Sequence, residues 1–383
     1  MKESTLKDLT LNITDGKHGD CEGQDNSGYY FISCKDVHDG QIYYEGARQI
    51  TEKDYIDTHK RTQLEPNDIL ITNSGTIGRM AFIKETPLVY RTTFQKSVAI
   101  VKPNPDLIYP LYLYYQLQNC VAQFINSSNG SAQKNLLLST MRAFKIKYHC
   151  DFSIQHRIAS ILSSYDDLIE NNQKQIKLLE EAAQRLYKEW FVDLRFPNYE
   201  NTPVVDGVPE GWRIGRLDEL GEFKRGKTIT KDSVISGNVP VVAGGLEPAY
   251  FHNTANTVAP VITVSGSGAN AGFTRMYHVN VWASDCSFVD SNTTENIYMI
   301  YCYLKANKAD LDRLQKGAAQ PHVYAKDINA MTIMIANNVL LLRFNETVSP
   351  IFTKIGNLFQ QIEKLKEARD RLLPKLMSGE LEV

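Results

Sequence analysis

The sequence predicts an α+β protein with two mixed α/β globular parts in tandem repeat, joined by two long helices that form an antiparallel intramolecular coiled coil. Three observations predict it: motifs that recur in the two halves, two stretches with a heptad spacing of apolar residues, and a linker rich in Pro, Gly and Asn between the halves. The chain has 383 residues, of which 43% are hydrophobic and 22% charged. Such a length is typical of about two to three domains, and such a composition is typical of a folded protein.

The first globular part is expected at residues 1–150, and its motifs return later in the chain. The matched segments are 6–9 with 217–220, 16–17 with 226–227, 71–75 with 262–266, 130–133 with 317–320, and 181–186 with 367–372. The separation between matched segments shrinks steadily along the chain. A single insertion does not produce such a drift, whereas two copies of one unit with shorter loops in the second copy do.

A central helix is expected at residues 151–197. Apolar residues occupy two heptad series, at positions 158, 165, 172, 179 and 186 and at positions 162, 169, 176, 183 and 190, with Asn172 as the one polar member. Ser153 is a candidate N-cap, and Pro197 marks the end of the pattern. A helix of about 40 residues spans about 60 Å, too long for the core of one compact domain.

The linker and the second globular part are expected at residues 198–347, and a C-terminal helix at residues 348–383. The same heptad pattern returns in this last segment, with Ser349-Pro350 as its expected start, Gly379 as its stop and Pro374 as a kink. Two stripes of similar length favour pairing of the two helices. The alternative is two separate amphipathic helices, each packed on its own globular part.

Several kinds of catalytic or metal site are missing from the sequence. The six cysteines form no C-x-x-C pair, and the eight histidines do not have metal-ligand spacing, so no metal site is expected. Phosphate-loop, zinc-protease, nucleophile-elbow and amino-methyltransferase motifs are absent. Residues 266–271 fit G-x-G-x-x-A, but a strand-like alternation follows where a dinucleotide site needs a helix, so a Gly-rich turn is the better interpretation.

The repeated turns carry side chains suited to DNA. Arg and Lys contact phosphates or guanine edges, and Asn and Gln pair with adenine. The candidate DNA-binding residues are Lys17, His18, Asn73, Ser74, Gly75, Thr76, Arg79, Gln95, Lys96, Gln133, Lys134, Lys224, Arg225, Lys227, Ser265, Ser267, Asn270, Arg275, Gln320, His322 and Tyr324. The net charge of −2 argues against a protein that coats nucleic acid non-specifically. From these residues alone, ordinary polar loops are the alternative.

The chain resembles a specificity (S) subunit of a type I restriction-modification system along essentially its whole length. The resemblance rests on the duplicated layout, Val208-Pro209-Glu210-Gly211-Trp212 at the opening of the second half, the turns at 74–78 and 317–320, and the ending at 372–380. The first half departs from the pattern because it lacks the Pro-Glu-Gly-Trp opening.

The resemblance implies a non-catalytic DNA reader. Each globular part would be a target recognition domain that binds one half of a split sequence in double-stranded DNA, and the helices would set the half-site spacing. The helices would also dock two modification subunits, the methyltransferases that use S-adenosylmethionine. Restriction subunits would add translocation and cleavage with ATP and Mg. No cofactor is expected in this chain. No stretch approaches the roughly 18 uncharged apolar residues of a membrane span, and the N-terminus lacks the apolar core of a signal peptide, so no membrane contact and a cytoplasmic location are expected.

Two other functions are compatible with the residues. One is a stand-alone DNA-binding regulator, which would bind duplex DNA tightly without partners. The other is a coiled-coil adaptor whose two globular parts bind protein and show no preference for DNA.

Overall fold

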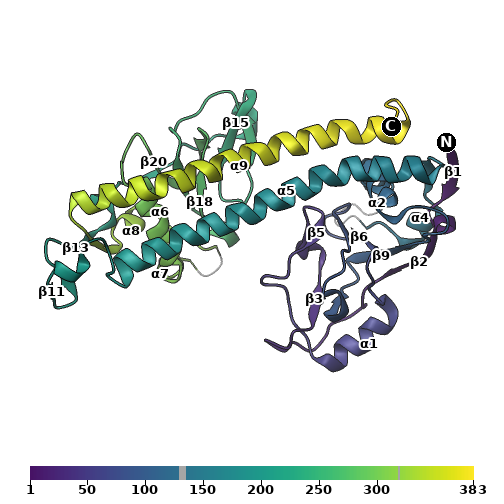
Figure 1. The fold of residues 1–383 in the computed structure, drawn as a ribbon, viewed down its shortest axis with the longest axis horizontal. Coiled ribbons are helices and arrows are strands. Elements are labelled where there is room, and N and C mark those ends of the chain that lie inside the picture. The colour runs from purple at the N-terminus through teal and green to yellow at the C-terminus, as the bar shows by residue number, and fades with distance from the viewer. Residues whose placement is uncertain (129–134, 318–319) are drawn as a thin grey trace. The chain divides into compact units, whose positions relative to one another are not determined.

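The structure of the chain is a computed structural model that describes residues 1–128, 135–317 and 320–383. It divides into two compact units. Unit 1 comprises Met1–Leu168 and Leu365–Val383, and unit 2 comprises Ile169–Lys364. Each unit therefore contains one globular part together with a section of each long helix (Figure 1).

Unit 1 is built around an antiparallel four-stranded sheet. Its strands, in the order β2-β9-β6-β7, are β2 (Thr10–Asp15), β9 (Val98–Pro103), β6 (Ile69–Thr72) and β7 (Met80–Phe82). All four residues of β6 are buried, as is typical of a continuous apolar run that is covered on both faces. Helix α1 (Glu52–Thr62) lies on the opposite side of this sheet from α5 (Phe152–Tyr187), as Figure 1 shows.

Three shorter strand pairs and three helices complete the globular part of unit 1. The antiparallel pairs are β1 (Lys2–Thr5) with β10 (Lys145–Tyr148) and β4 (Val37–His38) with β5 (Gln41–Ile42), and the parallel pair is β3 (Tyr30–Ile32) with β8 (Thr92–Phe94). The helices are α2 (Pro110–Asn119), α3 (Val121–Asn126) and α4 (Leu138–Ala143). Short 3-10 turns lie at Lys7–Leu9, Cys34–Asp36 and Val89–Arg91.

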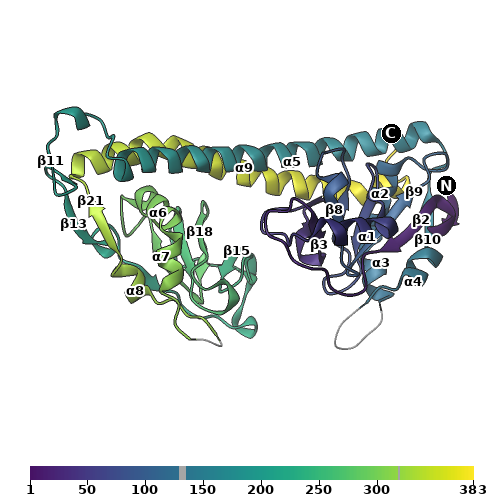
Figure 2. The same cartoon turned by 90° about the horizontal axis from the view of Figure 1, so that it is seen from below.

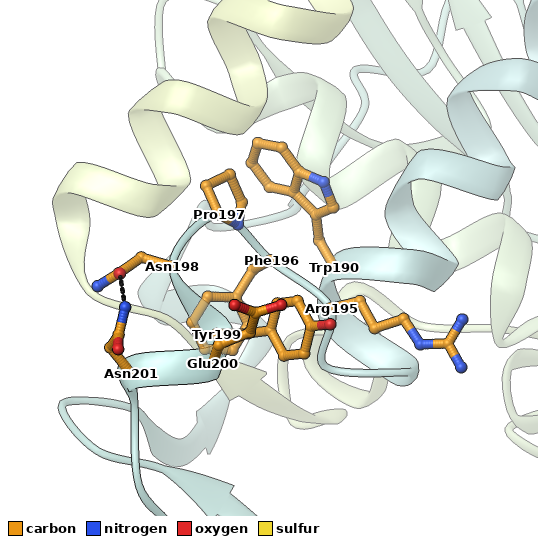
Figure 3. Close-up of a pocket in the computed structure, with 8 residues that line it drawn as sticks. All are labelled: Trp190, Arg195, Phe196, Pro197, Asn198, Tyr199, Glu200 and Asn201. Carbon is orange, nitrogen blue, oxygen red and sulfur yellow. Dashed lines mark hydrogen bonds between the residues drawn. The ribbon is translucent and has the colours of Figure 1, made fainter.

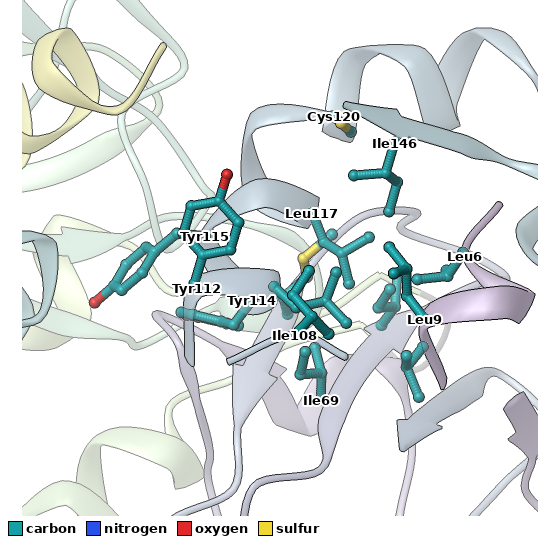
Figure 4. Packing of buried hydrophobic residues seen from close by; sticks show 14 of the residues in the cluster. Leu6, Leu9, Ile69, Ile108, Tyr112, Tyr114, Tyr115, Leu117, Cys120 and Ile146 are labelled. Atoms are coloured by element: carbon teal, nitrogen blue, oxygen red, sulfur yellow. The ribbon is translucent and has the colours of Figure 1, made fainter. Parts of the chain in front are cut away.

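Helix α2 fills the centre of the main core of unit 1. Figure 4 shows its side chains Tyr112, Tyr115 and Leu117 beside residues of the sheet and of the N-terminal turn. Leu376 and Met377, from the end of the C-terminal helix, are buried in the same core. The last turns of that helix therefore belong to the fold of the first globular part.

Unit 2 repeats this topology. Its four-stranded antiparallel sheet has the order β14-β20-β17-β18, with β14 (Lys224–Arg225), β20 (Cys286–Asp290), β17 (Val261–Ser265) and β18 (Thr274–Tyr277). Strand β13 (Arg213–Arg216) pairs with β21 (Thr332–Ile335) as β1 pairs with β10, and β15 (Ser236–Val242) runs parallel to β19 (Trp282–Ala283) as β3 does to β8. The helices are α6 (Ile297–Ala306), α7 (Lys308–Arg313) and α8 (Ala325–Asn329), and α6 packs against β17 and β18 (Figure 2).

The two units differ just before β6 and β17, which are equivalent strands of the two sheets. Unit 1 has α1 there, whereas unit 2 has a hairpin in which β15 pairs with β16 (Tyr250–His252). Ahead of its sheet, unit 2 also has a small hairpin of β11 (Val204–Val205) and β12 (Val208–Pro209). Its 3-10 turns lie at Tyr199–Asn201, Leu217–Glu219, Lys231–Ser233 and Gly268–Asn270.

The central helix α5 begins where expected but with a different cap. The backbone N–H of Ser153 donates to Oδ1 of Asp151 at 2.7 Å, so Asp151 caps the helix and the prediction of Ser153 was wrong. The α-helix ends at Tyr187 and continues as one π-turn over Lys188–Val192, before Pro197 is reached.

The C-terminal helix α9 spans Asn338–Ser378 and starts ten residues before the expected position 348. Asn337 supplies the cap, because its Oδ1 accepts from the Leu340 N–H at 3.0 Å. Leu341 and Phe344 are buried on the first turns, which makes this extra segment an amphipathic part of the helix. Pro350 therefore lies inside the helix and not at its first turn.

Candidate nucleic-acid interface

In unit 1, three loops carry most of the predicted DNA-binding residues and are joined by backbone hydrogen bonds. Lys17 donates its N–H to Phe94 O at 2.8 Å, and Lys96 donates to Lys17 O at 3.1 Å. Asn73 donates its N–H to Ser97 O at 3.0 Å, which connects the turn after β6 to the loop at residues 94–97. We call residues 16–18, 73–79 and 94–97 loop surface 1. The structure thus brings together Lys17, Asn73, Ser74, Gly75, Thr76, Arg79, Gln95 and Lys96, with His18 next to Lys17.

The turn after β6 is fixed by its own hydrogen bonds. The N–H of Gly78 donates to Thr72 O at 2.9 Å, and the N–H of Arg79 donates to Thr72 Oγ1 at 2.9 Å. Gly75 and Gly78 have φ of 79° and 89°, a conformation that glycine adopts without strain. The backbone of this turn is therefore held in place, while Gly75, Thr76 and Arg79 are exposed.

Several side chains of loop surface 1 already have partners. Lys17 Nζ lies 3.6 Å from Asp54, and although burial lowers its pKa, the charges of Cys21, Asp54 and Asp57 outweigh burial and raise it. His18 Nε2 lies 2.9 Å from Asp15 Oδ2.

Three predicted residues of unit 1 differ from those above: Asn73, Gln133 and Lys134. Asn73 is buried, and its side-chain oxygen has no hydrogen-bond partner among the described residues, so its role in direct DNA contact stays a prediction. Gln133 and Lys134 lie outside the residues that the structure describes.

In unit 2, the equivalent loops meet in the same way. The N–H groups of Gly226 and Lys227 donate to Cys286 O and Ala283 O, both at 2.9 Å, and Val323 donates to Gly266 O at 3.1 Å. We call residues 224–227, 265–273, 283–286 and 320–324 loop surface 2. It brings together Lys224, Arg225, Lys227, Ser265, Ser267, Asn270, Gln320, His322 and Tyr324.

Asp285 is the central charge of loop surface 2. Its carboxylate pairs with the guanidinium of Arg225, and its Oδ2 accepts from Ser267 Oγ at 2.5 Å. The positive charge of Arg225 is thus compensated within the unit. Sequence reasoning did not single out Asp285, because an acidic residue in a polar loop gives no signal of its own.

The remaining predicted residues of unit 2 differ in their accessibility. Ser265 is buried and donates to Gly244 O at 3.0 Å, and Asn270 Nδ2 lies 3.4 Å from the same carbonyl. Lys224, Lys227 and Gln320 are exposed. Tyr324 is exposed and stacks on His322, with 6.0 Å between ring centroids.

Arg275 lies on β18, outside loop surface 2. Its Nη1 donates to Leu246 O at 2.9 Å and lies 3.7 Å from Glu247, and its guanidinium covers the ring of Tyr277 at 5.0 Å. These contacts all lie within the unit, and the role of Arg275 in direct DNA contact stays a prediction.

A cavity of about 400 Å³ lies in unit 2, where α5 ends and the linker begins. It is lined by Trp190, Arg195, Phe196, Pro197, Asn198, Tyr199, Glu200 and Asn201, and Figure 3 shows the hydrogen bond between Asn198 and Asn201 across one side of it. None of the predicted DNA-binding residues lines this cavity.

In residues 1–128, 135–317 and 320–383, no cluster of His, Cys, Asp or Glu is arranged to hold a metal ion. No helix in these ranges is long and apolar enough to cross a membrane.

The comparison with known proteins decides the family. The profile of the "Type I restriction modification DNA specificity domain" matches residues 1–181 and 209–338. The chain belongs to this family. Among its relatives, the type I restriction enzyme MjaIX specificity subunit of Methanocaldococcus jannaschii is 30% identical over 389 residues, which cover 92% of this chain and 87% of that protein. The type I restriction enzyme HindI specificity subunit of Haemophilus influenzae is 21% identical and covers 99% of each chain.

A solved relative shares the fold of this specificity subunit. The crystal structure of the type I restriction-modification S subunit from M. genitalium superposes with a TM-score of 0.56 at 17% identity, covering 98% of this chain and 96% of that chain. The family match falls in two segments, so the chain carries two specificity domains in tandem, each of mixed helices and strands. Its function is DNA sequence recognition in a type I restriction-modification complex.

Proposed function

We propose that loop surfaces 1 and 2 each read one half of a split sequence in double-stranded DNA. The observation that carries this proposal is one hydrogen-bonded arrangement that is repeated in both units. A Gly-Lys segment lies against the turn that precedes β9 in unit 1 and β20 in unit 2, and a β-bridge joins the Gly-rich turn to a segment that is distant in sequence. Ser74 bridges to Asn135 in unit 1 as Ser267 bridges to His322 in unit 2. Two similar surfaces in one chain suit a site with two separate half-sites.

We further propose that α5 and α9 pair as an antiparallel coiled coil that sets the spacing of the half-sites. In unit 1, Asp166 of α5 contacts Arg369 of α9, and in unit 2, Asn172 Nδ2 lies 3.4 Å from Gln361 Oε1. The residue number rises along α5 while it falls along α9, which supports an antiparallel pair. The heptad residues Leu162, Ile169 and Ile176 are buried, as expected for such a seam.

The chemistry of the complex is assigned to partner subunits in this proposal. The chain itself is non-catalytic and holds no cofactor. It docks two modification subunits that use S-adenosylmethionine, and restriction subunits add ATP and Mg. The near-neutral charge of the chain is compatible with partner subunits that share the phosphate contacts. Its proposed place is the cytoplasm, a proposal supported by the lack of a helix in the described residues that could cross a membrane.

The test is co-expression with the methyltransferase encoded by the adjacent reading frame. We expect a complex of one copy of this chain with two methyltransferases, and methyladenine at a split motif in the methylome of the host. A particle that ignores the methyltransferase would contradict the proposal. Tight binding of that particle to duplex DNA would then support a regulator, and indifference to DNA would support a protein adaptor.

A further inference from the structure

The backbone identifies which residues of the two units occupy equivalent positions in the reading turns. In unit 1, the carbonyl oxygen of Thr72 accepts from the N–H of Gly78, and the N–H of Thr72 donates to Arg79 O at 2.8 Å. In unit 2, the carbonyl oxygen of Ser265 accepts from the N–H of Gly272, and the N–H of Ser265 donates to Phe273 O at 2.9 Å. Arg79 and Phe273 therefore stand at the same place, one residue before the strand that leaves the turn.

Strand pairing and glycine geometry support the same equivalence. Ile71 pairs with Met80 in unit 1, and Val264 pairs with Thr274 in unit 2, so the residues that precede these strand partners correspond. The second glycine of each turn has nearly the same φ, 89° at Gly78 and 87° at Gly272. The match of 71–75 with 262–266 that the sequence suggested is thus displaced by two residues, and Arg275 is not the counterpart of Arg79.

The two equivalent side chains are both accessible but chemically opposite. Arg79 is exposed, and no described side chain forms a hydrogen bond or an ion pair with its guanidinium. Phe273 is exposed by 36%, which leaves an apolar ring at the surface of a polar loop. The neighbouring arginines of unit 2 are both engaged, Arg225 by Asp285 and Arg275 by Glu247.

We propose that Arg79 and Phe273 are equivalent base-reading positions of the two domains, an inference that rests on the proposed function. Arg79 reads a guanine, because a guanidinium can donate two hydrogen bonds to O6 and N7 in the major groove. Phe273 reads a thymine, because an aromatic ring packs against the C5 methyl group and offers nothing to a guanine edge. The rigid turns hold both Cα atoms in place, so the identity of one side chain decides the base.

The experiment is the methylome of a host that expresses the chain with its adjacent methyltransferase. We expect Arg79→Ala to relax one guanine of one half-site, with a roughly ten- to hundredfold loss of discrimination against the other bases, and to leave the other half-site intact. Arg79→Gln is expected to shift that position toward adenine. Phe273→Ala is expected to relax one thymine of the other half-site, and Phe273→Arg to shift that position to guanine.

Arg213→Ala is the matched control, because it removes an exposed arginine of unit 2 that lies on β13, outside loop surface 2, and pairs with Glu219. It is expected to keep both half-sites unchanged. The inference is overturned if Phe273→Ala relaxes no base, if Arg213→Ala relaxes one, or if Arg79→Ala lowers methylation of all sites equally with no change of motif. Absence of any split motif with the unaltered chain would instead refute the proposed function, so the two failures are distinguishable. If one alanine variant fails to fold, the shift expected from Arg79→Gln or Phe273→Arg decides the question.

Discussion

Asp166 of α5 accepts a hydrogen bond from Arg369 of α9 at 2.6 Å, and its second oxygen accepts from Tyr115 of α2, also at 2.6 Å. One carboxylate thus connects both long helices to the core of unit 1. Arg369 stands within the apolar stripe of α9, where a charged side chain is tolerated only with a partner. The side chains of Asp166 and Arg369 are 28% and 21% exposed, so solvent weakens their attraction only in part.

Arg369→Ala is expected to lower the free energy of unfolding by about 1–3 kcal/mol, because it leaves a half-buried carboxylate with one partner fewer. Thermal or urea unfolding of the full chain measures the change. Arg371→Ala is the control, since Arg371 forms an i,i+4 pair with Glu367 and its side chain is 77% exposed. That variant is expected to stay within about 0.5 kcal/mol of the unaltered chain. Equal losses in both variants would show that the bond to Asp166 adds nothing.

Insertion of one heptad into both helices tests whether they set the half-site spacing. Asn172 and Gln361 face one another, so seven residues added after each would lengthen both helices at the same level. Such an insertion adds about 10 Å, and with about 3.4 Å per base pair the unread spacer should grow by about three base pairs. Sequencing of methylated sites should show both half-sites preserved. A motif with unchanged spacing would contradict the role of the helices as a ruler.

Gly16→Ala is expected to destabilise unit 1 by about 1–3 kcal/mol or more and to abolish methylation at the site. A Cβ at Gly16 would overlap the backbone carbonyl of Phe94, which cannot move without loss of the hydrogen bond to Lys17. Gly23→Ala is the control, because the nearest atom to a Cβ there is Gln49 O at 4.0 Å. Thermal unfolding should separate the two variants. A tolerated Gly16→Ala would mean that the loops can rearrange around it.

The repeat could be predicted from the sequence wherever the same backbone contact requires the same residue. Gly16 and Gly226 were matched because each lies against a carbonyl that leaves no room for a side chain. The buried heptad positions of α5, such as Leu162 and Ile176, could also be predicted, because the apolar spacing alone defines that face.

The equivalence of Arg79 with Phe273 could not be predicted in this way. Residues 71–75 and 262–266 look alike, yet the turn in unit 2 is one residue longer, and Gly268 and Gly272 fall two and three positions later than that match places them. Alignment of Gly75 with Gly268 and of Gly78 with Gly272 would have given the correct match, since a positive φ is a stronger constraint than a shared Ser. The start of α9 was missed because the apolar run after Asn337 fits a strand as well as a helix. The contacts that these residues make within unit 2 decide between the two structures.

Acid should destabilise unit 2 through His278, which lies at the end of β18 against α9. Its ring stacks on Phe359 at 6.1 Å and lies so close to Gly356 that a Cβ there would meet it at 2.9 Å. Burial lowers the pKa of His278 to about 4, whereas an unfolded chain has a histidine pKa near 6.5. The unfolded chain therefore binds the proton first. The contribution of His278 to stability is constant above about pH 6.5 and falls by about 1–3 kcal/mol as the pH drops toward 4. His278→Asn should flatten the fall measured by urea unfolding between pH 7 and 4, whereas His156→Asn, at an exposed position of α5, should leave it unchanged. An identical acid slope in the His278→Asn variant would show that other groups cause the loss.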